Sequence, residues 1–231
     1  MYYIKKESKM LEDYINQLKP LVLKLFSQDS SGHDISHLER TMNIALLLQK
    51  YEGGDRIVIG IAAFLHDIHK IMQNDSGKYV SPKDSIEKVK EILDTIDLEQ
   101  EKVDKILHAI EYHEVYNWNN PKNKEDDINT LILQDADNLD AIGAIGIGRT
   151  FSYMAVHNVP MYDASIPLNN DEDYGETKIV MDQSTIHHFY HKLFKLGDNM
   201  NTKTAKELDI KRSGFMRNFV DEFLKEWNGE K

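Results

Sequence analysis

Apolar residues recur every three or four positions along most of the chain, a spacing that predicts amphipathic α-helices. One such stretch runs from Glu7 to Phe26 and contains Pro20, which we expect to kink or divide the helix. The next starts after Gly32, where Ser36 and Glu39 have the spacing of a capping box. The first part of the chain is therefore predicted to be helical.

The most continuously apolar stretch, IVIGIAAFL, belongs to a central helix that we predict from Arg56 to Lys70. Residues 53–55, Gly-Gly-Asp, supply a helix stop followed by a cap. The apolar run ends abruptly at His66 and Asp67. Burying a carboxylate without a partner costs several kcal/mol, so this pair must be saturated with hydrogen bonds or neutralised by a cation.

Helical periodicity continues through the rest of the chain, and no segment makes a convincing strand. The predicted helices cover Asp84–Ile96, Glu101–His113, Ile128–His157, Ser184–Leu196 and Thr202–Trp227, and the predicted loops cover Trp118–Asp127 and Asn158–Gln183. Gly143, Gly146 and Gly148 weaken the longest of these helices by propensity, so they indicate close packing against another helix. The expected fold class is all-α.

Length and composition favour a single domain over residues 1–231. No linker rich in Pro, Gly or Ser divides the 231 residues, and 41% hydrophobic residues suffice for a sizeable core. The segment MYYIKKESKM lacks the apolar centre of a signal peptide, and no run approaches the length of a membrane span. We therefore expect a cytoplasmic protein without a membrane partner.

Cysteine content and net charge exclude several classes of function. The chain has no cysteine, which excludes disulfides, thiolate metal sites and thiol nucleophiles. Its net charge of −11 argues against binding a nucleic-acid polymer through a basic surface. Small anions can still bind where a site is locally positive.

Four residues form a candidate metal site: His37, His66, Asp67 and Asp137. Imidazoles and carboxylates suit divalent ions, and we expect Mn²⁺ or Mg²⁺, with Ni²⁺, Fe²⁺ and Zn²⁺ as alternatives. Four protein ligands leave two positions of a six-coordinate ion open. Because a water and a phosphate oxygen can take these positions, the set indicates metal-assisted hydrolysis.

The order of these residues resembles the H...HD...D signature of the HD-domain metal-dependent phosphohydrolases. The surrounding segments SGHDISHLER, AAFLHDIHK, DADNLDAIGAIGIGRTF and HHFYHKLFKLGDNMNTKTAKEL are similar to those of small bacterial HD hydrolases of the YedJ and YpgQ type. The resemblance extends from about Ser31 to Trp227. It implies an HD-domain helical bundle and hydrolysis of a nucleoside or deoxynucleoside triphosphate to monophosphate and pyrophosphate.

The two aspartates of the DAD segment are expected to differ in role. In a helix, Asp135 and Asp137 point about 200° apart, so both cannot easily face one ion. The family pattern aligns the ligand with Asp137, on whose face Asp140 also lies. Asp135 and Asp140 are then expected to orient a metal ligand or a water by hydrogen bonding to it without contacting the ion. Asn138 stands where relatives commonly carry arginine, which puts the substrate preference in question.

Histidines and basic residues near the four ligands are candidates for catalysis and substrate binding. His113 lies on an apolar helix face, and the resemblance implies that it handles a proton, whereas His69 is either a second catalytic residue or an ordinary helix-end residue. Arg40 and Lys70 each lie one turn after a predicted ligand and are expected to bind phosphate. Arg149 is a further candidate for the same role.

Other functions remain open at this point. The same metal site would serve a 5'-nucleotidase or a cyclic-nucleotide phosphodiesterase, and a non-catalytic sensor of metal and nucleotide is a third possibility. The loop Asn158–Gln183 is predicted to close over bound nucleotide, with its acidic residues 171–173 away from the phosphates. A surface excursion or a homodimer contact is the alternative for this loop.

Overall fold

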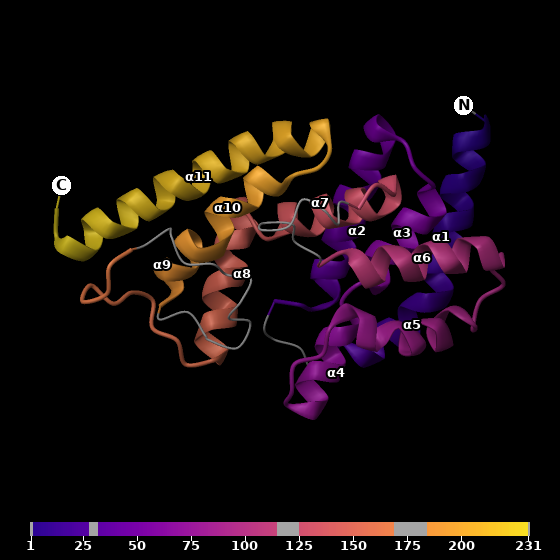
Figure 1. The fold of residues 1–231 in the computed structure, drawn as a ribbon, viewed down its shortest axis with the longest axis horizontal. Coiled ribbons are helices and arrows are strands. Elements are labelled where there is room, and N and C mark those ends of the chain that lie inside the picture. Colours follow the sequence, from indigo (N-terminus) through magenta and orange to yellow (C-terminus); the bar gives the residue numbers. More distant parts are fainter. Residues whose placement is uncertain (1, 28–31, 115–124, 169–183, 231) are drawn as a thin grey trace.

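Helix α3 (Arg56–Leu65) is the element around which the other helices pack in the computed structural model, which describes residues 2–27, 32–114, 125–168 and 184–230 (Figure 1). The other elements are α1 (Tyr2–Leu25), α2 (Ile35–Glu52), α4 (Ile68–Ser76), the 3-10 helix η1 (Pro82–Ser85), α5 (Ile86–Leu93), α6 (Gln100–Tyr112), α7 (Ile128–Asp140), α8 (Gly143–Val156), α9 (Thr185–His188), the π-turn η3 (Phe189–Leu193), α10 (Phe194–Leu196), η4 (Gly197–Asn199) and α11 (Lys203–Asn228). None of the described residues lies in a strand, which confirms the all-α expectation.

The sequence of α3 explains its central place. Every residue from Ile57 to Leu65 is buried, and the helix packs against α1, α2, α6 and α7. Burying the isoleucine, valine, phenylalanine and leucine side chains of this helix stabilises the fold by about 1.5–3 kcal/mol each. Asp55 starts the helix, since its carboxylate accepts hydrogen bonds from the backbone nitrogens of Ile57 and Val58, as the Gly-Gly-Asp segment predicted.

The central helix is shorter than expected. The prediction of one helix from Arg56 to Lys70 is wrong, because α3 ends at Leu65 and α4 starts at Ile68 after a turn at Asp67 (φ −93°, ψ 15°). Neighbouring residues of a continuous helix point about 100° apart. The turn therefore lets two adjacent side chains, those of His66 and Asp67, face the same point.

A second break divides the predicted helix Ile128–His157 into α7 and α8. Gly143 adopts φ +77°, which a residue with a side chain rarely takes, and it follows the turn that ends α7. A Cβ on Gly146 would lie 2.2 Å from the carbonyl oxygen of Ala141, so this glycine permits close approach to the end of α7. Gly148 meets nothing within 4 Å, and the packing role predicted for it is wrong.

Helix α2 starts differently from the prediction. Its cap is Asp34, whose Oδ1 accepts a hydrogen bond of 3.0 Å from the backbone nitrogen of His37, and the predicted capping box of Ser36 and Glu39 is not used. The carboxylate of Asp34 thus accepts a hydrogen bond from a first-turn backbone nitrogen that has no partner within the helix, which is the role of an N-cap residue. His37 still lies in that first turn, as expected.

Helix α7 joins two groups of helices. In Figure 1, α1–α6 lie on one side and α8–α11 on the other, and α7 contacts α2, α3 and α6 as well as α8 and α11. One cluster of buried apolar side chains runs through both groups. No helix in the described ranges is long and apolar enough to cross a membrane.

Part of the predicted loop Asn158–Gln183 is anchored to the second group. The carbonyl oxygens of Pro160 and Met161 accept hydrogen bonds of 2.8 and 3.0 Å from the backbone of α9. Residues 169–183, which include the acidic cluster of the predicted lid, lie outside the described residues, as do residues 118–124 of the other predicted loop.

Candidate metal centre and adjoining pocket

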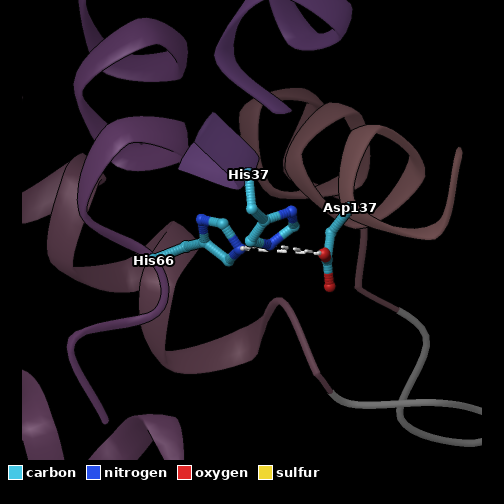
Figure 2. Close-up of side chains that lie close together, drawn as sticks. All are labelled: His37, His66 and Asp137. Carbon is cyan, nitrogen blue, oxygen red and sulfur yellow. Dashed lines mark hydrogen bonds and ion pairs between the residues drawn. The ribbon is translucent and has the colours of Figure 1, made fainter. Parts of the chain in front are cut away.

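Three parts of the fold bring the four predicted metal ligands together. His37 comes from the first turn of α2, His66 and Asp67 from the turn between α3 and α4, and Asp137 from α7. Figure 2 shows the two imidazoles and the carboxylate of Asp137 converging. Asp137 Oδ1 lies 3.5 Å from Nε2 of His37 and 3.7 Å from Nε2 of His66, and Asp67 Oδ2 lies 3.2 Å from Nε2 of His37.

Hydrogen bonds fix the orientation of both imidazoles. Nδ1 of His37 contacts a carboxylate oxygen of Asp140 at 2.7 Å, and Nδ1 of His66 contacts the carbonyl oxygen of Ala63 at 2.9 Å. Because these oxygens only accept, both Nδ1 atoms carry the hydrogen and donate it. The two Nε2 atoms then present lone pairs to each other across 3.2 Å. That arrangement requires a cation, either a proton or a metal ion, between or beside them.

Charges in the cluster respond to this geometry. Burial by itself lowers the pKa of His66, but the carboxylates of Asp67 and Asp137 overcome it and raise the pKa to about 9. Burial opposes ionisation of both carboxylates, yet the neighbouring histidines hold their pKa values below the usual range. The carboxylates thus favour a positive charge among these side chains, which is the charge that a metal ion would supply.

Asp140 connects His37 to two arginines. Its carboxylate accepts hydrogen bonds from Arg40 at 2.8 and 3.0 Å and from Arg149 at 3.0 Å, besides the contact with Nδ1 of His37. Burial opposes the charge, but His37 and Arg40 lower the pKa of Asp140 to about 2. The carboxylate is therefore ionised and holds the imidazole of His37 in one orientation, as the role predicted for Asp140 requires.

Asp135 lies away from the metal cluster, which corrects the expectation that it orients a ligand. Its two carboxylate oxygens accept hydrogen bonds of 2.7–3.0 Å from the backbone and side chains of Asn201 and Thr202. These contacts fix the start of α11 against α7. The predicted separation of the two aspartates by helix geometry is correct, but the function of Asp135 is structural.

The basic residues are arranged differently from the prediction. Arg40 lines a groove with Asn43 and Lys211 on the far side of Asp140, so it does not reach the cavity beside the metal cluster. The structure therefore does not bring Arg40 to the cavity where the expected contact with phosphate would be made, and its guanidinium binds Asp140 instead. Lys70 and Arg149 do line the cavity beside the cluster.

Three buried polar atoms support a cation site here. Asp67 Oδ2, His69 Nε2 and His113 Nε2 have no hydrogen-bond partner among the described residues. Leaving such atoms unpaired costs about 1–3 kcal/mol each. Each lies in a group of ligand atoms within 4.8 Å of one another that could hold an ion. The donor set of nitrogen and oxygen atoms therefore fits the divalent ion predicted from the sequence.

His69 and His113 present the same nitrogen toward this cluster. Nδ1 of His69 donates to the carbonyl oxygen of His66 at 3.1 Å, and Nδ1 of His113 donates to that of Ile110 at 2.6 Å. Burial, aided by nearby positive charge, lowers the pKa of His113 to about 4. His113 is therefore neutral at pH 7, with an Nε2 that can accept a proton.

Two connected cavities adjoin the cluster. The inner chamber, of about 70 Å³, is lined by His33, Asp67, Lys70, Glu114, Asp137, Asn138, Ala141, Arg149 and Lys192. The outer pocket, of about 210 Å³, shares with it His33, Lys70, Ala141, Arg149 and Lys192 and adds the rings of Tyr153 and His157. Those two rings lie 4.3 Å apart, centroid to centroid.

Sequence analysis missed three residues of the inner chamber. His33 lies four positions before His37, a spacing that could have been noticed, and its ring lies 5.8 Å from that of His37. Glu114 accepts a hydrogen bond of 2.7 Å from Lys70. Lys192 comes from a distant helical segment, and nothing in its local sequence distinguishes it from surface lysines.

Known proteins share the sequence and fold of this chain. The HD domain family model matches residues 34–142. The protein YpgQ of Bacillus subtilis is 31% identical over 224 residues, which make up 97% of each chain. A crystal structure of an HD-superfamily hydrolase from Bacillus thuringiensis is 33% identical, with a TM-score of 0.69 over 97% of this chain and 100% of that one. The crystal structure of YpgQ in complex with ADP is 28% identical, with a TM-score of 0.65 over 91% of this chain and 97% of that one.

Proposed function

The chain belongs to the HD domain family of metal-dependent phosphohydrolases, and we propose that it hydrolyses nucleotides in the inner chamber. The observation that carries this proposal is the placement of an acid-histidine cluster and of three cations, Lys70, Arg149 and Lys192, around one small cavity. Metal ligands alone would fit many hydrolases. Cations beside the metal ligands can stabilise the negative charge that develops on the phosphoryl oxygens during phosphoryl transfer.

His37, His66, Asp67 and Asp137 are proposed to hold one divalent ion. A bound divalent ion acts as a Lewis acid toward phosphoryl oxygens and toward water. The opposed Nε2 atoms of the two histidines and the unpartnered Oδ2 of Asp67 support this ligand set. Mn²⁺ and Mg²⁺ are the ions to test first.

The other residues of the site are proposed to bind the substrate and to orient the side chains that act on it. Lys70 and Arg149 would contact the oxygens of the phosphoryl group in the chamber. Asp140 keeps His37 in place and holds Arg149 through its contact at 3.0 Å. Nε2 of His113 is the proposed proton acceptor, with His69 beside it, since the two rings lie 5.7 Å apart.

The outer pocket is proposed to receive the nucleoside. Its aromatic wall of Tyr153 and His157 offers a flat surface for a base, and Gln73 and Asn74 offer polar groups. YpgQ, whose structure holds ADP, shares this fold and 28% of aligned residues. The proposed reaction is cleavage of a nucleoside or deoxynucleoside triphosphate between its α and β phosphates.

A nucleotide panel tests the proposal directly. Purified protein is incubated with Mn²⁺ or Mg²⁺ and with mono-, di-, tri- and cyclic nucleotides, and the products are resolved by chromatography. We expect monophosphate and pyrophosphate in equal amounts from triphosphates. Orthophosphate from monophosphates alone would identify a nucleotidase, and opening of cyclic nucleotides a phosphodiesterase. Nucleotide binding without turnover would leave the sensor hypothesis.

A further inference from the structure

A groove on the far side of Asp140 from the metal centre has no part in the proposed reaction. Its volume is about 480 Å³, more than that of the inner chamber (about 70 Å³) and the outer pocket (about 210 Å³) together. Sites for small molecules usually measure about 300–1,000 Å³. The groove lies where α2, the α7–α8 junction and α11 meet. We call it the basic groove, because it is lined by the cations Arg40, Lys211 and Arg212, together with Ile142, Ile145 and Phe215.

The guanidinium of Arg212 is held in place at one wall of the basic groove. Its Nη1 donates a hydrogen bond to the carbonyl oxygen of Leu139, and its stem packs over Gly143, where an added Cβ would lie 3.1 Å from Cγ of Arg212. Burial lowers the pKa of Arg212, and the more distant carboxylate of Asp140 opposes this effect, but an arginine stays charged at neutral pH. A half-buried charge of this kind is stabilised when an anion binds beside it.

Arg40 and Lys211 add positive charge that is only partly neutralised. Arg40 donates from Nε and Nη2 to Asp140 at 2.8 and 3.0 Å, so its Nη1 has no acceptor among the described residues. Lys211 forms no ion pair within the part of the chain that the structure describes. Asp140 is the one carboxylate among the described residues that line the groove, and it also binds His37 and Arg149. Three cations therefore face one shared carboxylate, in a chain whose net charge is −11.

Apolar side chains beside these cations are exposed to solvent. Phe215 follows Lys211 by four positions and Arg212 by three, so the three side chains share one face of α11. Phe215 is 53% exposed, and Ile145 at the start of α8 is 50% exposed. Exposed apolar side chains next to cations held in position provide both surfaces that an organic anion needs, one for its acid group and one for its ring.

Charge and shape decide which occupant fits. A two-fold contact between copies of the chain, centred on the basic groove, would place its cations against those of the other copy, and like charges in such contact cost several kcal/mol. The net charge of −11 opposes a nucleic-acid polymer. A concave site of this volume instead suits a small molecule.

We propose that the basic groove binds a small organic anion, in which an apolar ring carries a phosphate, sulfonate or carboxylate group. The acid group meets Arg40, Lys211 and Arg212, and the ring covers Phe215 and Ile145. The groove is separate from the inner chamber, so this binding requires no hydrolysis there.

Fluorescence titration with anilinonaphthalene sulfonate tests the proposal, since this dye is an organic anion whose emission rises in an apolar site. The neutral comparison is N-phenylnaphthylamine, which has the same rings without the sulfonate. Lys211→Glu and Phe215→Ser change the groove. Their matched controls on α11 are Lys203→Glu, where the lysine side chain is 85% exposed, and Ile210→Ser, where the isoleucine is 72% exposed and does not line the groove. Thermal unfolding without dye verifies that each variant folds.

We expect Lys211→Glu and Phe215→Ser each to weaken binding of the sulfonate about tenfold, the effect of losing one charge-assisted hydrogen bond or one buried ring. Both control variants should stay within about twofold of the parent. Lys211→Glu should leave binding of the neutral dye nearly unchanged, whereas Phe215→Ser should weaken binding of both dyes.

Three results would overturn the proposal. Equal losses in Lys203→Glu and Lys211→Glu would mean that the dye responds only to overall charge. Loss of binding in Tyr153→Ser, with full binding in both groove variants, would place the dye in the outer pocket. A dimer that sedimentation detects in the parent and that Phe215→Ser dissociates would assign the groove to a second copy of the chain.

Discussion

Two glycines of α8 allow a matched test of how the α7–α8 junction is built. Gly146 and Gly148 receive the same change, to alanine, within one helix and only two residues apart. At Gly146 the new Cβ would lie 2.2 Å from the carbonyl oxygen of Ala141, whereas at Gly148 it meets nothing within 4 Å. Helix propensity contributes equally at both positions. The difference between the variants therefore isolates the contact with the end of α7.

The magnitudes follow from these contacts. Replacing glycine by alanine inside a helix stabilises by about 1 kcal/mol, which is the expected gain for Gly148→Ala. The carbonyl oxygen of Ala141 belongs to the backbone, so the clash at Gly146 is relieved only by moving α8 relative to α7. Overpacking of this kind costs about 1–3 kcal/mol. Because an approach of 2.2 Å to a backbone atom places the cost in the upper part of this range, subtracting the propensity gain of about 1 kcal/mol leaves Gly146→Ala destabilised by about 1–2 kcal/mol net.

Thermal and urea unfolding measure both variants. For a chain of this length 1 kcal/mol shifts the midpoint by about 2–4 °C, so Gly148→Ala should unfold a few degrees above the parent and Gly146→Ala a few degrees below. Activity should fall only in Gly146→Ala, because Ala141 lines both cavities and Asp140 ends α7. Equal stabilisation of the two variants would refute the close approach at this junction.

Three further predictions concern charged residues. Asp137→Asn should lose bound Mn²⁺, as mass spectrometry of the metal content measures. Asp135→Asn should keep the ion but unfold at a lower temperature, because Asp135 fixes Asn201 and Thr202. The reverse result would mean that the wrong aspartate is the ligand. Asp140→Asn should weaken metal affinity about tenfold to a hundredfold, as titration with a competing chelator measures, since His37 loses its charged partner; unchanged affinity would contradict the orienting role. Burial opposes ionisation of Asp55, but Lys102 and the capping hydrogen bonds lower the pKa of this carboxyl. The ionised carboxylate therefore stabilises the fold above about pH 4, and this stabilisation is lost as the pH falls through the pKa of the folded state. The stability difference between the parent and Asp55→Asn, about 1 kcal/mol or less for a partly exposed pair, should therefore shrink between pH 7 and pH 3 in urea titrations, and a difference that grows toward acid pH would refute this assignment.

Local sequence patterns were sufficient to predict most of the helices, and together with the family resemblance they indicated the side chains that converge at the candidate metal centre. The apolar run of α3 ends in a histidine and an aspartate that could not be buried without a cation, and the structure brings His37 and Asp137 to them. Helical spacing also separated Asp137 from Asp135 correctly. The helix positions and the separation of the two aspartates depend on residues within a few positions of each other, where the geometry of one helix decides which side chains share a face. The meeting of His37 and Asp137 with His66 was instead implied by the family resemblance.

The two helix breaks were not predictable in the same way. Periodicity of apolar residues continues through His66 and Asp67 and through Ala141, because residues on both sides of each turn face the same core. The position of such a turn depends on contacts with the backbone of the neighbouring helix, such as the close approach of Gly146 to the carbonyl oxygen of Ala141. A pattern that records burial does not record a change of direction between two buried stretches.

The position of Arg149 shows how far one such break changes the site. In a straight helix from Ile128 to His157, Arg149 would lie about 18 Å along the axis from Asp137, at 1.5 Å per residue, too far to share a phosphate with it. The break after Ala141 turns α8 back, and the guanidinium of Arg149 comes within 3.0 Å of the carboxylate of Asp140 and lines the inner chamber. Arg40, one turn from His37, was the better candidate by sequence distance, yet it lies behind Asp140 in a separate groove. The family signature therefore indicated the candidate metal ligands, whereas sequence distance along a helix ranked Arg40 above Arg149, because the cations that surround the chamber are positioned by turns and not by helix faces.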